Sequence, residues 1–204
     1  MRLALLAVLS VAAAGPQSAD ECFQTGNKKL VKKDYDGAIA DYTKAIKLEP
    51  KHVSAYYNRG LARNAKGDLD GAIADFTRAI ELNPKYATAY YNRGTVKATK
   101  GDRNGAIADF TRAIELNSKY DAAYNNRGIT KKAKGDLDGA IADFTRAIEL
   151  NPKYDAAYNN RGITKKAKGD LDGAIADYTK AIELDPRNGR TYDNRADAKK
   201  AKGD

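Results

Sequence analysis

The chain repeats itself every 34 residues from residue 19 to residue 188, and the register never shifts. The five complete rows are 19–52, 53–86, 87–120, 121–154 and 155–188, and residues 189–204 begin a sixth row. Rows four and five differ at only five positions, so their structures should be interchangeable. A period of this length is typical of stacked helix pairs, because one pair cannot bury its apolar face alone.

Each row contains two helical patterns separated by a turn signal, such as Gly67 and Asp68 in row two. Glycine can take the left-handed conformation that closes the first helix, and aspartate can accept a hydrogen bond from the N–H groups that open the second. Row one has Lys33 and Asp34 here, so it keeps the cap but lacks the glycine. In row two the second pattern has the apolar spacing of a helix face, formed by Ala72, Ile73, Phe76, Ala79 and Ile80. The sequence therefore predicts an all-α chain.

The composition argues against catalysis and metal binding. Among 204 residues there are one Cys and one His, so the chain cannot form an internal disulfide or a cysteine-based zinc site. Any histidine-dependent catalytic group would have to use His52. Lys and Arg number 36 against 27 Asp and Glu, a net charge of +9 that is typical of a soluble, well-charged protein. We expect no enzymatic activity, no cofactor and no metal.

The first residues differ from the rows. Residues 3–14 form an apolar run, LALLAVLSVAAA, which follows Arg2 and ends in three alanines suited to signal peptidase. The run is too short to cross a bilayer core of about 30 Å. We expect residues 1–14 to be a cleaved export signal, residues 15–18 a short N-terminal segment, and the mature protein to be periplasmic or secreted without a transmembrane segment. The alternative is an uncleaved apolar helix packed on the first row. Cys22 follows an acidic stretch unsuited to lipid attachment, and we expect it to be a buried apolar residue.

The rows resemble the tetratricopeptide repeat (TPR). In row two the residues that carry the resemblance are Tyr56, Gly60, Ala72, Phe76, Ala79 and Pro84. It extends over residues 19–204, with Arg in place of the usual Leu at position seven of the row and Lys or Arg in place of Tyr at position eleven. The resemblance implies a right-handed superhelical solenoid of stacked antiparallel helix pairs. Five full repeats would be followed by a half repeat, 189–204, which is either a capping helix or a truncated repeat.

The resemblance also implies a concave wall lined by the first helix of each repeat, with positions two, five, six, nine and twelve facing the groove. Position six carries five asparagines in succession: Asn58, Asn92, Asn126, Asn160 and Asn194. Asparagine is a poor residue inside a helix, whereas its carboxamide can both donate to and accept from a peptide backbone. The row resembles the asparagine ladder of the O-linked N-acetylglucosamine transferase, which holds polypeptide. The alternative is that each Asn bonds to a neighbouring helix.

Lysines concentrate at position twelve in the later rows, as Lys132, Lys166 and Lys200. They favour an acidic or phosphorylated partner segment. Further basic ladders run at positions eleven and fourteen and could track phosphates, but a solvated face with lysine stems over apolar surface explains them better.

Arginine at position seven and aspartate at position twenty-three occur five times each. Pairing each Asp with the Arg of the next row uses all ten residues, and we expect these ion pairs to set the stacking of the repeats. The expected pairs are Asp41 with Arg59, Asp75 with Arg93, Asp109 with Arg127, Asp143 with Arg161, and Asp177 with Arg195.

Because the fold itself hosts many roles, function must lie in the surfaces. We expect an exported, non-catalytic scaffold that binds an extended or helical segment of another protein in its groove. The first alternative is a structural subunit of an envelope complex that uses its edges or outer face. The second is a binder of nucleic acid or anionic surfaces, which is weakened because no exposed aromatic residue lies among the lysines to stack on bases.

Overall fold

The computed structural model describes residues 18–203, and this part of the chain consists of eleven α-helices and no strand. The predicted all-α fold class is confirmed. The expected export signal, residues 1–14, lies outside the described residues. The helices are α1 (Ala19–Val31), α2 (Tyr35–Leu48), α3 (Val53–Lys66), α4 (Leu69–Leu82), α5 (Ala87–Thr99), α6 (Arg103–Leu116), α7 (Asp121–Ala133), α8 (Leu137–Leu150), α9 (Asp155–Ala167), α10 (Leu171–Leu184) and α11 (Gly189–Lys202).

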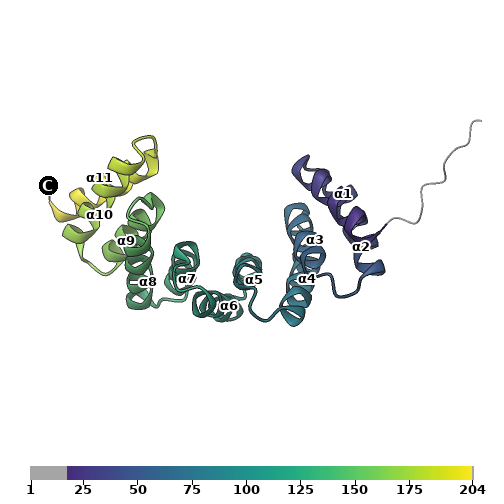
Figure 1. Ribbon diagram of the computed structural model, residues 1–204. Helices are drawn as coiled ribbons and strands as arrows, with labels where there is room; N and C mark the ends of the chain where they lie inside the picture. Colours follow the sequence, from purple (N-terminus) through teal and green to yellow (C-terminus); the bar gives the residue numbers. More distant parts are fainter. Residues whose placement is uncertain (1–17, 204) are drawn as a thin grey trace, which may run out of the picture.

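The helices stack side by side into an open arc (Figure 1). Each odd-numbered helix from α3 to α9 packs against the even-numbered helix that follows it and also against the one before it. In the middle of the arc α5 and α7 lie on the inner side and α6 on the outer side (Figure 1). Odd-numbered helices of successive repeats, such as α5 and α7, also contact each other, and we call the surface that the odd-numbered helices form the inner wall.

The core of each repeat depends on one aromatic ring facing one glycine. Phe76 on α4 is fully buried, and a Cβ atom placed on Gly60 of α3 would lie 2.8 Å from its Cε1 atom. A larger residue than glycine would push the two helices apart. On α11 the same position is Ala196, which fits because no described second helix packs there.

The turn within each repeat uses the left-handed conformation. Gly67 has φ 83°, and its equivalents in the next three repeats also have positive φ. Row one lacks the glycine, and Lys33 adopts φ 61° in its place. The turn therefore keeps its fold, but a lysine occupies the left-handed region of backbone conformation, which is unfavourable for a residue with a side chain.

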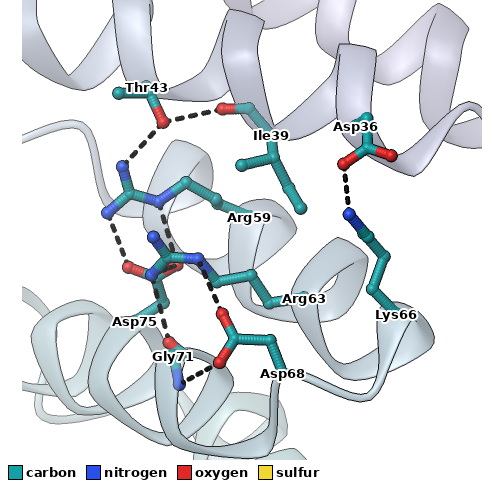
Figure 2. Close-up of polar contacts among 9 residues, drawn as sticks. All are labelled: Asp36, Ile39, Thr43, Arg59, Arg63, Lys66, Asp68, Gly71 and Asp75. Atoms are coloured by element: carbon teal, nitrogen blue, oxygen red, sulfur yellow. Dashed lines mark hydrogen bonds and ion pairs between the residues drawn. The ribbon is translucent and has the colours of Figure 1, made fainter.

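The arginines at position seven bind the aspartate of their own repeat. Arg59 Nε donates to Asp75 Oδ2 at 2.9 Å, and Arg59 Nη2 donates to Asp75 Oδ1 at 2.7 Å (Figure 2). The same two-pronged bond recurs in Arg93 with Asp109, Arg127 with Asp143, and Arg161 with Asp177. The predicted pairing between neighbouring repeats is wrong for Asp41 with Arg59, Asp75 with Arg93, Asp109 with Arg127, Asp143 with Arg161, and Asp177 with Arg195.

The physical reason is that the two helices of one repeat pack directly against each other and bury the aspartate between them. Asp75 is only 2% exposed, and it lies within reach of both Arg59 and Arg63 (Figure 2). The remaining donor of Arg59, Nη1, bonds to Thr43 Oγ1 of the preceding repeat at 3.0 Å. The link between repeats therefore exists, but its acceptor is a threonine hydroxyl.

The equal numbers of Arg and Asp led to the wrong pairing, because other residues replace one partner of the pair at each end of the array. In row one Asp41 pairs with Lys29 Nζ at 2.7 Å instead of an arginine. In the last helix Arg195 donates to Thr179 at 3.4 Å and lies over the ring of Tyr192. Equal numbers of Arg and Asp thus carried no information about which repeat supplies the partner.

We predict that Asp143→Asn lowers the free energy of unfolding by about 3 kcal/mol, because it leaves the partly buried Arg127 and Lys131 without a counter-charge. Urea denaturation measures the loss. Asp138→Asn is the matched control, since it lies on the same helix and its pair with Lys168 is exposed. It should cost less than about 1 kcal/mol. Equal losses in both variants would show that the buried network contributes little.

We also predict that Lys33→Gly raises the free energy of unfolding by about 1 kcal/mol, because it relieves the left-handed lysine. The reverse change, Gly67→Lys, should lower it by a similar amount. A Cβ on Gly67 meets nothing within 4 Å, so the cost comes from the backbone alone. Urea midpoints of the two variants should therefore move in opposite directions, and a shift in the same direction would contradict this account.

Candidate functional site

The ladder asparagines link successive helices of the inner wall. Asn92 Nδ2 donates to Tyr57 Oη at 2.7 Å, and Asn126 Nδ2 donates to Tyr91 Oη at 3.0 Å. Asn160 and Asn194 make the same step to the asparagine at position five, Asn125 and Asn159, whereas Asn58 donates to Asn27 at position nine of row one. Each bond spans from one repeat to the preceding one. Bonding to a neighbouring helix, which was the alternative interpretation of this ladder, is therefore present.

That bond uses only part of each carboxamide. Among the described residues nothing donates to the side-chain oxygen of Asn92, Asn160 or Asn194, and none of these atoms is buried without a partner. Asn126 differs, because its oxygen accepts from Asn125 Nδ2 at 3.3 Å. The ladder thus keeps acceptors that water or a bound backbone N–H can reach.

Aromatic pairs lie beside the first half of the ladder, and sequence reasoning missed them as a set. The rings of Tyr57 and Tyr86 have centroids 4.9 Å apart, and those of Tyr91 and Tyr120 lie 4.8 Å apart. The members occupy positions five and thirty-four of one row. An alignment of position thirty-four across the rows would have revealed these tyrosines. This position lies at the junction with the next repeat, and the junction brings it beside position five.

These tyrosines are uncharged at physiological pH. Burial raises the pKa of Tyr57 and of Tyr120 to about 12. In the later repeats position five becomes Asn125 and then Asn159. The inner wall therefore changes along its length from neutral aromatic surface to amide surface.

The position-twelve lysines lie along the later part of the same wall. Lys132 follows the half-exposed Ile129 by one helical turn on α7, so the two share a face. Lys166 Nζ lies 3.5 Å from Asp197 Oδ2 on α11. Within residues 18–203 no carboxylate pairs with Lys132 or Lys200. The wall thus carries positive charge that the described residues do not neutralise.

Most members of the other two basic ladders are engaged in ion pairs. At position eleven Lys97, Lys131 and Lys165 pair with the buried Asp of their own repeat. At position fourteen Lys66, Lys100, Lys168 and Lys202 each pair with an exposed Asp of the preceding repeat. The regular spacing of these lysines therefore follows from the stacking of the repeats. Because the lysines named are paired with aspartates, they do not form a row of free phosphate-binding groups.

His52 and Cys22 have structural surroundings. His52 Nδ1 accepts from the Ala55 N–H at 3.3 Å, and the histidine ring packs on Phe23. Cys22 is 1% exposed, between Ala45 and Ala55. In the described part of the chain no three His, Cys, Asp or Glu side chains gather in a way that could hold a metal ion.

None of the helices between residues 18 and 203 has the length and apolar character needed to span a membrane.

These features define a helical repeat protein with a continuous inner wall. Family models described as TPR repeat and tetratricopeptide repeat match residues 26–67, 61–101, 87–120, 122–154 and 156–188. The chain belongs to the tetratricopeptide repeat family. A search of curated proteins found no match.

Solved structures share the fold. The chain is similar to MamA, at 30% identity over 84% of this chain and 94% of that one, with a TM-score of 0.77. It is also similar to YrrB, described as a TPR protein with an unusual peptide-binding site, at 25% identity over 88% and 93% of the two chains, with a TM-score of 0.76. A tetratricopeptide repeat protein from Parabacteroides merdae has 24% identity and a TM-score of 0.81, over 92% and 75% of the two chains. This last likeness concerns the fold alone.

Proposed function

We propose that this protein is an exported, non-catalytic scaffold that binds a segment of a partner protein along the inner wall of its arc. The observation that carries the proposal is the row of asparagines, of which Asn92, Asn160 and Asn194 keep an open oxygen while their amides bond to the preceding repeat. An extended backbone offers N–H donors at regular intervals, so it can use acceptors that recur once per repeat. The likeness to YrrB, a protein described as having a peptide-binding site, supports the binding of a peptide segment.

The principal alternative is a structural subunit that uses its edges or outer face. The outer helices carry ion pairs within one helix, such as Arg146 with Glu149 at 2.8 Å. Such exposed pairs contribute little energy, and each charge already has its partner within the same helix. The inner wall, by contrast, combines open acceptors, aromatic rings and unpaired lysines, so it is the better candidate.

The test is site-specific photocrosslinking in the organism that produces the chain. Benzoylphenylalanine replaces Ile129 on the inner wall or, in the control, Arg146 on α8, whose side chain is 48% exposed. We predict partner crosslinks from residue 129 and none from residue 146. Crosslinks from residue 146 alone would favour the outer-face alternative.

A ladder variant then separates binding from stability. Changing Asn92, Asn126 and Asn160 together to Ala should abolish the crosslink from residue 129. Its effect on thermal stability should be small, because each lost hydrogen bond, about 1 kcal/mol, is partly offset by the higher helix propensity of alanine. The control changes three asparagines that end outer helices, Asn83, Asn117 and Asn151. If this control loses the crosslink equally, the ladder acts only through stability.

Export has its own test. We predict that the protein purified from its native cells begins near Gly15 and is recovered outside the cytoplasm, because the apolar run and its three alanines fit a cleavable signal. Intact mass measures the start of the mature chain. A mass that still includes residues 1–14 would refute cleavage.

A further inference from the structure

A cavity of about 180 Å³ opens between α5 and α7, in the middle of the inner wall. This is smaller than the roughly 300–1,000 Å³ of sites that hold drug-sized molecules. The space therefore suits a single side chain. Its walls include Thr95, Ala98, Asn126, Ile129 and Thr130, and Phe110 also lines it.

The cavity is apolar in character although threonines line it. Thr95 Oγ1 donates to the carbonyl of Tyr91 at 3.0 Å, and Thr130 Oγ1 donates to the carbonyl of Asn126 at 2.8 Å. Both hydroxyl donors are thus used inside their own helices. Ile129 is 39% exposed and Phe110 is almost fully buried. An aliphatic or aromatic side chain would find carbon atoms on most sides.

Ala98 keeps this space open. It occupies position twelve, where row one has Leu30 and rows four and five have Lys132 and Lys166. Any of these longer side chains would occupy the volume that alanine leaves. The sequence of this one repeat therefore sets the place of the cavity in the array.

Positive charge begins directly beside the cavity. Lys132 lies one turn beyond Ile129 on α7, and no described carboxylate pairs with it. Lys166 is one repeat further, and its contact with Asp197 is long, at 3.5 Å. The two lysines lie on α7 and α9, which contact each other. Helices in contact pack about 10 Å apart, a distance that an extended chain covers in about three residues.

We propose that the inner wall selects an extended segment with one aliphatic or aromatic side chain in the α5–α7 cavity. Acidic side chains spaced about three residues apart follow at Lys132 and Lys166. This assignment rests on the groove-binding function proposed above and names the chemistry of its partner. The tyrosine pairs of the earlier repeats are neutral, so charge selects only at the lysines.

The test begins with a phage library of random dodecapeptides selected on the full chain, with an albumin-coated surface as background. We expect the enriched peptides to share one large apolar residue and acidic residues on one side of it. Failure to enrich any peptide over background would overturn the groove function itself. Enrichment of peptides without this pattern would overturn only the assignment of the cavity and lysines.

The most enriched peptide is then measured by fluorescence anisotropy against three variants. Ala98→Leu, which copies Leu30 of row one, should weaken binding about tenfold or more because the cavity is filled. Lys132→Gln with Lys166→Gln should weaken binding about tenfold in 0.05 M salt and less in 0.5 M salt, since screening shortens the reach of the charges.

The matched control is Lys134→Gln with Lys168→Gln, which removes the same charge next to the same two helices but outside the cavity row. It should leave the affinity unchanged. Unfolding curves confirm that all variants are folded at the temperature of the measurement. If Ala98→Leu binds as tightly as the unchanged protein, or if the control pair weakens binding as much as the inner pair, the assignment is wrong.

Discussion

The structure depends on a buried carboxylate that one repeat surrounds with cations. Asp143, for example, receives two bonds from Arg127 and an ion pair from Lys131, and it is only 4% exposed. An unpaired charge at this depth would be strongly destabilising, so the two helices of a repeat must pack in the register that satisfies it. The last donor of the same arginine reaches Thr111 of the preceding repeat at 3.0 Å. One guanidinium thus fixes both the pairing within a repeat and the stacking between repeats.

The asparagine ladder adds a second link on the inner wall. Its amide groups bond from one first helix to the preceding one, while several of its oxygens remain accessible. Structural and binding roles need not exclude each other here, because a carboxamide has separate donor and acceptor atoms. A bound segment would therefore lie on a wall whose spacing is already fixed by the ladder, and little ordering of the protein would be needed.

Repetition in the sequence does not make the wall uniform. The aromatic pairs Tyr57 with Tyr86 and Tyr91 with Tyr120 occupy the earlier repeats, and asparagines and lysines occupy the later ones. From row two onward position twelve changes without taking part in the core, whereas position five changes from Tyr57, which packs on the core, to Asn125, which is buried. Because the contact between ring and glycine and the Arg–Asp pair recur in successive repeats, the stacking stays regular while other positions vary, and the cavity beside Ala98 arises from this variation.

The sequence by itself determined the all-α class, the helix pairs and the small and aromatic core positions, because a 34-residue period with helical spacing allows few other folds. It also indicated the left-handed turn that Lys33 now occupies without glycine. The sequence did not determine which aspartate each arginine contacts. Arg59 was assigned to Asp41 by sequence, whereas only the packing of α3 on α4 shows that Asp75 is the carboxylate it reaches. A period fixes which residue types recur, but distances between them depend on how neighbouring helices cross. For the same reason the open oxygens of the ladder and the α5–α7 cavity were decided only by tertiary structure.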